Sequence, residues 1–144
     1  MILRRARIEE RGQLEDLQRR ASLESHEYRE ALFAHPDAIA LPAGHIERGE
    51  VQVAEIDGRI AGFAVLLDHD GAAELDGLFV EPELWRRGIG SALVEEAVHS
   101  ARLRGLSLVT VVAAPAAKDF YERCGFTVEG AAETRFGPAL RMSR

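Results

Sequence analysis

Residues 75–93 read LDGLFVEPELWRRGIGSAL, and this stretch decides which fold the sequence predicts. An apolar strand pattern stops at a proline, and a loop with Arg-Arg-Gly-x-Gly then leads into a helical pattern. Free backbone N–H groups and the helix dipole make such a loop a site for anions. Gly88 and Gly90 let a ligand approach the backbone closely, and Arg86 and Arg87 supply positive charge. The segment therefore predicts an anion site between a strand and a helix.

The loop motif is short, so a second interpretation stays open, in which the glycines tighten a turn and the arginines are solvated. Two other phosphate-binding loops fit it poorly. A P-loop has Lys and then Ser or Thr after its second glycine, whereas Ser91 and Ala92 follow here. A Rossmann-type fingerprint has a third Gly or an Ala where this chain has Leu93. Leu93 therefore argues against a Rossmann-type domain with an all-parallel sheet.

The segments on either side of the loop alternate between strand and helix patterns. Alternating apolar residues over 51–56 predict a strand, and Asp57 and Gly58 predict a tight turn into a long strand over 59–68. The further predicted elements are a turn at 68–71, a strand over 73–80, a helix over 88–104 closed by Gly105, a strand over 106–112, a helix over 116–124 closed by Gly125 and a hairpin over 126–142. The continuous apolar run over 106–112 is typical of a strand buried on both faces.

The first third of the chain has weaker patterns. We expect a strand over 2–8, a helix over 9–21, a second helix over 22–33 and a break before Pro36, whereas residues 37–50 give no clear pattern. A strand-helix-strand crossover over 73–112 would place two strands parallel. The predicted fold class is α/β (α+β), with a mixed, mostly antiparallel sheet flanked by helices in a single domain over residues 1–144.

Composition and charge exclude several classes of protein. With 144 residues, 47% apolar and 29% charged, the chain fits one globular domain. A net charge of −6 argues against a nucleic-acid binder with a broad basic face. No apolar stretch approaches the ~20 residues that span a bilayer, and residues 1–13 lack a secretory signal pattern, so we expect a cytoplasmic protein. The single Cys124 and the scattered histidines predict neither a disulfide nor a metal site.

Three segments together resemble the GCN5-related N-acetyltransferase (GNAT) superfamily. They are residues 73–82 with AELDGLFVEP, residues 86–93 with RRGIGSAL and residues 114–126 with APAAKDFYERCGF. The last of them ends in the F-Y-x-x-x-G-F pattern of the family. The glycine-loop motif and the F-Y-x-x-x-G-F motif are independent of each other, and their spacing resembles that of the family, which makes the resemblance specific. It covers roughly residues 51–142.

The resemblance implies acetyl-CoA as the cofactor and a sheet whose fourth and fifth strands splay apart in a V. The pantetheine arm would hydrogen-bond to backbone groups of Leu78, Phe79 and Val80. The pyrophosphate would rest on the loop residues, which are Arg86, Arg87, Gly88, Ile89, Gly90 and Ser91. This chain departs from the family pattern twice: Trp85 stands where the family often has Gln or Arg, and Ala114 stands where it often has Asn before a proline.

Transfer of an acetyl group to an amine needs a neutral amine and a proton for the departing thiolate. The resemblance implies that Tyr121 donates this proton, and the alternative is that Tyr121 only packs beside Phe120. The spacing from Glu74 to Gly88 resembles that of the glutamate base in histone-acetylating members. Asp76 and a water are the other candidates for the base, and a further alternative is that both carboxylates only keep the cleft negative.

We therefore predict an acetyl-CoA-dependent N-acetyltransferase that acetylates the amine of a small molecule by direct transfer. Direct transfer disfavours an acetyl-thioester on Cys124. We expect no metal, nucleic acid or membrane partner. The alternative is a GNAT-like sensor that binds acyl-CoA and transfers nothing.

The acceptor pocket is the least readable part of the sequence. Residues 22–50 and the last hairpin would shape it, although His26, His35 and His45 in the first of these regions are each explained more simply as solvated loop residues. The apolar stretch 138–142 suggests an interface strand and hence a homodimer.

Overall fold

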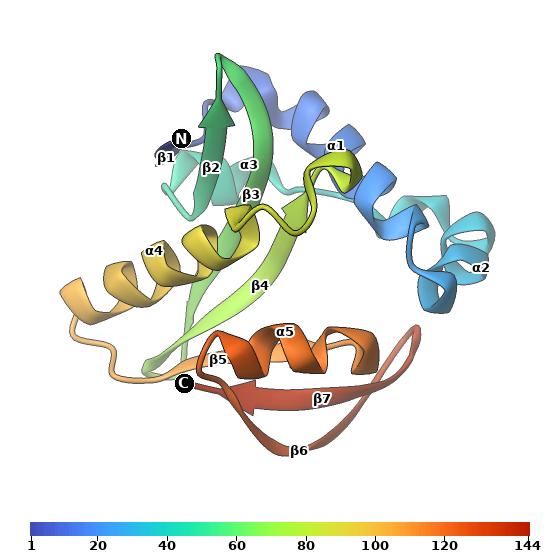
Figure 1. Ribbon diagram of the computed structural model, residues 1–144, viewed down its shortest axis with the longest axis vertical. Helices are drawn as coiled ribbons and strands as arrows, with labels where there is room; N and C mark the ends of the chain where they lie inside the picture. Colours follow the sequence, from blue (N-terminus) through green and yellow to red (C-terminus); the bar gives the residue numbers. More distant parts are fainter. The chain divides into compact units, whose positions relative to one another are not determined.

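The computed structural model describes residues 1–144, and the side chains of residues 26–28 are outside this description. The helices and strands follow the chain in the order β1 (Ile2–Arg5), α1 (Arg11–Leu23), α2 (His26–Ala34), α3 (Ala43–Glu47), β2 (Val51–Ile56), β3 (Arg59–His69), β4 (Ala72–Val80), α4 (Ile89–Leu103), β5 (Val109–Ala113), α5 (Lys118–Arg123), β6 (Thr127–Thr134) and β7 (Gly137–Ser143) (Figure 1). Short 3-10 turns lie at Ile8–Glu10, Pro36–Ala38, Pro82–Leu84 and Pro115–Ala117.

The strands form a seven-stranded sheet in the order β1-β2-β3-β4-β5-β7-β6. β2 pairs antiparallel with β1 and β3, and β7 pairs antiparallel with β5 and β6. β4 and β5 pair in parallel, with Ala73 opposite Val109 and Glu74 opposite Thr110. Because α4 connects these two parallel strands, the predicted crossover is present. The predicted fold class, a mixed and mostly antiparallel sheet flanked by helices, is confirmed.

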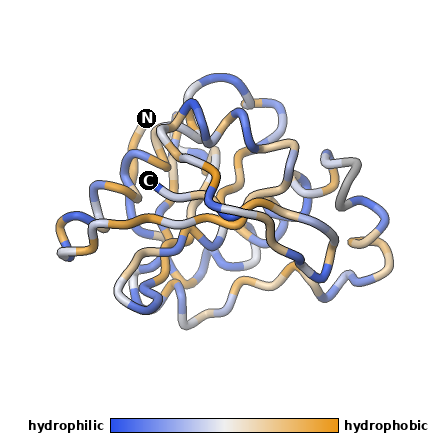
Figure 2. Tube along the Cα trace, turned by 90° about the horizontal axis from the view of Figure 1, so that it is seen from below, coloured by the Kyte–Doolittle hydropathy of each residue, from blue (hydrophilic) through white to orange (hydrophobic). Residues whose placement is uncertain are grey.

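Backbone contacts divide the chain into two compact units, which are Met1–Val65 with Gly77–Leu93 and Leu66–Asp76 with Val94–Arg144. β3, β4 and α4 each pass from one unit into the other. The first unit buries one stripe of α1 and both faces of the middle of β3, with Leu14, Leu17, Val51, Val53 and Phe63 at 0–1% exposure. The second unit buries Val94, Val98, Val111, Phe126 and Met142. Figure 2 shows the corresponding alternation of hydrophobic and hydrophilic residues along the chain.

Two tight turns set the register of the central strands. Asp57 and Gly58 join β2 to β3 with φ of 50° and 77°, and Asp70 and Gly71 join β3 to β4 with φ of 50° and 81°. Positive φ at both central residues is the hairpin geometry that matches the right-handed twist of strands, and Asp-Gly adopts it readily. The hairpin predicted at Asp57 is confirmed, and the second turn is narrower than the predicted 68–71 because β3 continues to His69.

Two predicted strands differ from the structure, and a segment without a prediction forms a helix. The strand expected over 2–8 ends at Arg5, and part of the unpatterned segment 37–50 forms the short helix α3. The strand expected over 106–112 begins at Val109, because Leu106 donates its backbone N–H to Ala101 at 2.9 Å and completes the end of α4 with Gly105 at φ 77°. Burial of that strand on both faces was also wrong, since Val112 is 47% exposed.

The C-terminal strand β7 has a partner on each edge. Met142 lies opposite Val111 of β5 on one side and opposite Val128 of β6 on the other. The expectation that residues 138–142 supply an interface strand is therefore wrong, because their backbone groups are used inside the sheet. β6 is the outer strand of this hairpin, shown in red-brown in Figure 1.

Candidate active site

The end of β4 belongs to the first unit and is held by backbone contacts. Glu81 donates its N–H to Ala61 of β3 at 2.9 Å, and the carbonyl of Val80 accepts the indole N–H of Trp85 at 2.8 Å. Gly62 of β3 lies close to this segment, because a Cβ at position 62 would be 2.7 Å from the carbonyl oxygen of Phe79. A side chain at position 62 would therefore collide with the end of β4.

The loop after β4 has the backbone shape of an anion site. Arg86 and Gly88 both adopt left-handed backbone conformations, with φ of 66° and 81°. The carbonyl of Gly88 accepts the first helical hydrogen bond, from Ala92 at 3.0 Å, so α4 begins at Ile89. N–H groups in the first turn of a helix have no partner inside the helix, and the helix dipole adds partial positive charge there. The arrangement suits a phosphate group.

The charged side chains around the loop divide into paired and surface groups. Arg20 of α1 forms an ion pair with Glu81, with 3.3 Å between Nε and one carboxylate oxygen, and this hydrogen bond raises the pKa of Arg20. Arg86 and Arg87 are exposed, and none of the ion pairs formed by the described side chains includes either of them. The guanidinium groups of Arg86 and Arg87 are therefore exposed on the loop, whereas that of Arg20 is paired with Glu81.

Tyr121 lies on α5 in the second unit and is 7% exposed. Its ring packs edge-on against Phe120, at 5.1 Å between centroids, and against Phe126, at 5.5 Å. Burial raises the pKa of the Tyr121 hydroxyl well above its usual value, with a smaller contribution from Cys124. The structure thus shows the packing contacts of Tyr121, and the proton donation that the resemblance implies stays a prediction.

The end of α5 is fixed by the last residue of the chain. Arg144 donates one Nη1–H to the carbonyl of Cys124 at 2.8 Å and another to Glu95 of α4 at 2.6 Å. Gly125 takes φ 90°, as expected for a glycine that closes a helix, and Phe126 donates its N–H to the carbonyl of Tyr121 at 3.0 Å. Cys124 is 8% exposed and packs in the core. These contacts hold the turn of α5 that carries Tyr121.

The two candidate carboxylates differ in exposure. Glu74 is half-buried on β4 opposite Thr110, whereas Asp76 is exposed. Both belong to the second unit, and alternation along β4 places them on one face of the strand. The other predicted strand residues, Leu78, Phe79 and Val80, are half-buried and belong to the first unit. Phe79 packs against Phe63 of β3 at 5.3 Å between ring centroids.

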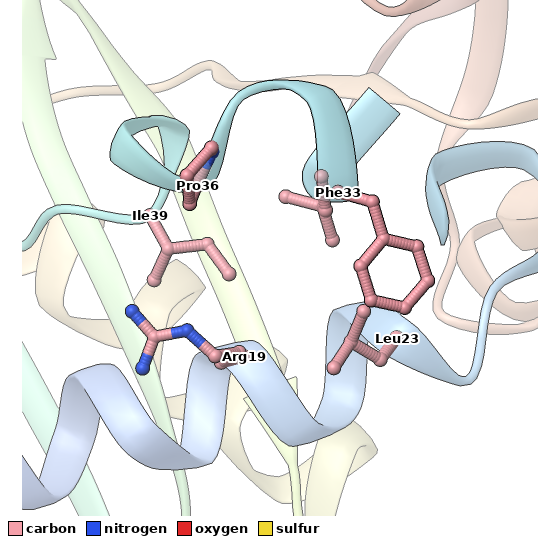
Figure 3. A pocket seen from close by; sticks show the side chains of 6 residues that line it. Arg19, Leu23, Phe33, Pro36 and Ile39 are labelled. Atoms are coloured by element: carbon pink, nitrogen blue, oxygen red, sulfur yellow. The ribbon is translucent and has the colours of Figure 1, made fainter. Parts of the chain in front are cut away.

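The segment expected to shape the acceptor pocket contains a shallow apolar pocket of about 140 Å³ (Figure 3). Its lining comes from α1, α2 and the turn after α2, and consists of Arg19, Leu23, Leu32, Phe33, Pro36 and Ile39. His35 is exposed, as expected, and the side chain of His26 lies outside the described residues. His45 does not lie in a loop: it is half-buried in α3, with Nδ1 3.3 Å from Glu50.

The described part of the chain contains neither a metal-binding group of side chains nor a membrane-spanning helix. It contains no group of three or more His, Cys, Asp or Glu residues that could hold a metal ion. None of its helices is long and apolar enough to cross a membrane.

Comparison with known proteins agrees with this geometry. The model of the acetyltransferase (GNAT) family matches residues 13–126. The uncharacterized N-acetyltransferase YafP of Escherichia coli (strain K12) is 38% identical over 81 residues, which are 56% of this chain and 48% of that protein. The 5-NmdU N-acetyltransferase of Pseudomonas phage PaMx11 is 35% identical over 85 residues, 58% of this chain and 61% of that protein. The chain thus spans about half the length of the curated relatives it matches.

Solved structures show the same fold. The PaiA N-acetyltransferase of Thermoplasma acidophilum, crystallised in complex with coenzyme A, superimposes with a TM-score of 0.81 at 23% identity and covers 99% of this chain and 97% of that one. Nourseothricin acetyltransferase is 29% identical with a TM-score of 0.60, over 65% of this chain and 62% of that one.

The parallel β4–β5 pair inside an antiparallel sheet, with the left-handed loop before α4, defines a GNAT fold. The chain belongs to the acetyltransferase (GNAT) family. The predicted family is confirmed, and the predicted enzyme class, an N-acetyltransferase, is the class of this family and of the relatives that it matches.

Proposed function

We propose that this chain is an acetyl-CoA-dependent N-acetyltransferase that acetylates the amine of a small molecule by direct transfer. The loop before α4 carries the proposal, because Arg86 and Gly88 adopt left-handed conformations directly before the first turn of α4 and the guanidinium groups of Arg86 and Arg87 are exposed there. A pyrophosphate is the ligand that such a loop fits. The complex of the similar PaiA enzyme with coenzyme A supports this choice of cofactor.

The cofactor residues of the proposal are those of the family motif. Leu78, Phe79 and Val80 offer backbone groups to the pantetheine arm, and Arg86, Arg87, Gly88, Ile89, Gly90 and Ser91 hold the pyrophosphate. The first three are half-buried at the end of β4, and the exposed guanidinium groups and first-turn N–H groups belong to the second set. Acetyl-CoA, when bound, supplies the acetyl group as a thioester.

Two side chains of the second unit would move the protons. Glu74 would take a proton from the ammonium form of the acceptor, directly or through a water, since only the neutral amine has a lone pair to attack with. As the C–N bond forms and the C–S bond breaks, Tyr121 would donate its proton to the departing thiolate, and the second proton lost by the attacking nitrogen would return to Tyr121 directly or through a water. Burial raises the pKa of Tyr121, so at neutral pH the hydroxyl carries the proton that this role needs.

A small-molecule acceptor is supported by two of the similar proteins. One relative is named for 5-NmdU, and one solved structure is a nourseothricin acetyltransferase. We propose further that residues 1–144 form one catalytic domain, and that a homodimer, if it forms, uses β6 rather than β7. The cytoplasmic location stays a prediction.

Ala114 favours a second candidate function, a sensor that binds acyl-CoA without transferring the acyl group. It precedes the turn Pro115–Ala117 and provides no side-chain hydrogen bond there, whereas the family often has Asn. The enzyme and the sensor are distinguished by measuring whether free thiol is released from acetyl-CoA in the presence of each member of a panel of amines, amino acids and polyamines. The enzyme gives turnover with at least one amine. A sensor gives thermal stabilisation by acetyl-CoA and no turnover with any of them.

A further inference from the structure

Trp85 is the single tryptophan of the chain and stands where the family often has Gln or Arg. Its indole N–H donates to the carbonyl of Val80 at 2.8 Å, while the side chain stays 46% exposed. The bond links the side chain of Trp85, which precedes Arg86, to the backbone of Val80, the last residue of β4. It therefore fixes where the loop leaves the strand.

The carbonyl that Trp85 occupies lies on a particular edge of β4. Glu81 donates its N–H to Ala61 of β3, and backbone groups of successive residues in a strand point to opposite edges. The carbonyl of Val80 therefore faces away from β3. The proposed function places the pantetheine arm at the backbone of this same residue.

The residue after Trp85 needs support. Arg86 has φ of 66°, a left-handed conformation that is unfavourable for a residue with a Cβ. Such a conformation persists where the surroundings hold it. The backbone N–H of Trp85 makes a long bond of 3.2 Å to Pro82, so the shorter indole bond is the stronger anchor next to the strained residue.

We propose that Trp85 is a positioning residue for the cofactor: by binding the Val80 carbonyl, its indole N–H holds the Arg86–Gly88 backbone in the shape that receives the pyrophosphate. This inference rests on the proposed function. It also gives the departure from the family pattern a role, because an N–H donor is kept at position 85 where the family often has Gln or Arg.

The test uses the full chain and coenzyme A as the probe. Trp85→Phe keeps an aromatic ring and removes the N–H, and Trp85→Arg returns an N–H donor. Glu83→Gln, an exposed change on the same turn, is the matched control.

Dissociation constants from calorimetry and kcat at saturating acetyl-CoA are measured for all four proteins. We expect Trp85→Phe to weaken coenzyme A binding about threefold to tenfold, the range for one neutral hydrogen bond, with kcat changed less than twofold. Trp85→Arg should recover most of the affinity.

A second measurement needs no variant. Because the chain has one tryptophan, its emission reports on the loop, and it should change during a coenzyme A titration with the midpoint found by calorimetry. Affinity of Trp85→Phe within twofold of wild type, or unchanged wild-type emission at saturating coenzyme A, overturns the inference. If the wild-type chain binds no coenzyme A at all, the proposed function itself fails, and the two failures are thereby distinguished.

Discussion

The loop between β4 and α4 and the helix α5 prepare for the proposed reaction by different means. In the proposed function the loop would act through its backbone, with Arg86 and Gly88 left-handed and its charged side chains at the surface. The helix would act through one side chain, Tyr121, which is buried and packs against two aromatic rings. A backbone site tolerates changes of side chain and fails when its φ angles change, whereas a side-chain site depends on a single group. The two regions therefore differ in which substitutions harm them.

Tyr121→Phe tests the side-chain region and carries the largest expected effect. The variant keeps the ring and its contacts with Phe120 and Phe126 and loses the hydroxyl. General acid catalysis typically contributes 10²–10⁴-fold, so kcat at saturating amine should fall by about that factor while coenzyme A affinity stays within twofold. Steady-state kinetics and calorimetry check both values. Phe120→Leu, which keeps the hydroxyl, is the control. Retention of more than about a third of kcat by Tyr121→Phe would leave Tyr121 as a packing residue.

Gly88→Val tests the backbone region. A Cβ at position 88 would meet no atom within 4 Å, so the variant should fold, but φ of 81° is strained for a β-branched residue. The loop should shift to relieve this strain, and coenzyme A affinity should fall by roughly tenfold to a hundredfold, or about 1.4–2.8 kcal/mol. Calorimetry measures the affinity, and thermal unfolding confirms the fold. Gly12→Val, in open space on α1, is the matched control. Equal affinities of the two variants would remove the loop from the cofactor site.

The burial of Tyr121 predicts a pH effect on stability. The folded pKa is raised above the unfolded value, so this contribution is fully present below pH ~10 and is lost as pH rises toward the folded pKa. Wild type should therefore lose about 1 kcal/mol more than Tyr121→Phe between pH 8 and pH 11. Urea unfolding of both proteins at the two pH values measures the difference. Parallel losses would mean that the phenol ionises as easily in the folded chain as in the unfolded one.

Ala114→Asn tests the turn before α5 and has the smallest expected effect. It adds the side chain that the family often has before the proline, at a turn that now lacks a side-chain cap. One new neutral hydrogen bond to the cofactor would tighten acetyl-CoA binding about threefold to tenfold. Calorimetry gives the affinity. A raised melting temperature with unchanged affinity would instead show that the new Asn only caps the turn Pro115–Ala117.

Sequence patterns predicted best what depends on local chemistry. The Asp57-Gly58 turn, the closure of α4 at Gly105 and the glycine loop all follow from backbone conformations that few residue types adopt. Long-range packing escaped prediction. The exposure of Val112 depends on which segments cover β5, and apolar content alone does not reveal this.

The least predictable part of the candidate site is the bond between Trp85 and Val80. The donor and the acceptor are five positions apart in the sequence, on either side of the 3-10 turn Pro82–Leu84, and no periodic pattern marks the pair. The raised pKa of Tyr121 was equally hidden, because it depends on how deeply the folded chain buries the hydroxyl, and a sequence motif does not show this. In both cases a residue type was visible in the sequence and its surroundings were not.

The position of β7 between β5 and β6 has a consequence for the order in which the second unit folds. β5 and β6 do not pair with each other, and each becomes bonded in the sheet through residues 137–143. Until β7 inserts, β5 lacks its antiparallel partner and β6 has no partner, so both strands of the second unit expose unpaired edges. Insertion of β7 is therefore expected to be the step that completes the sheet of this unit.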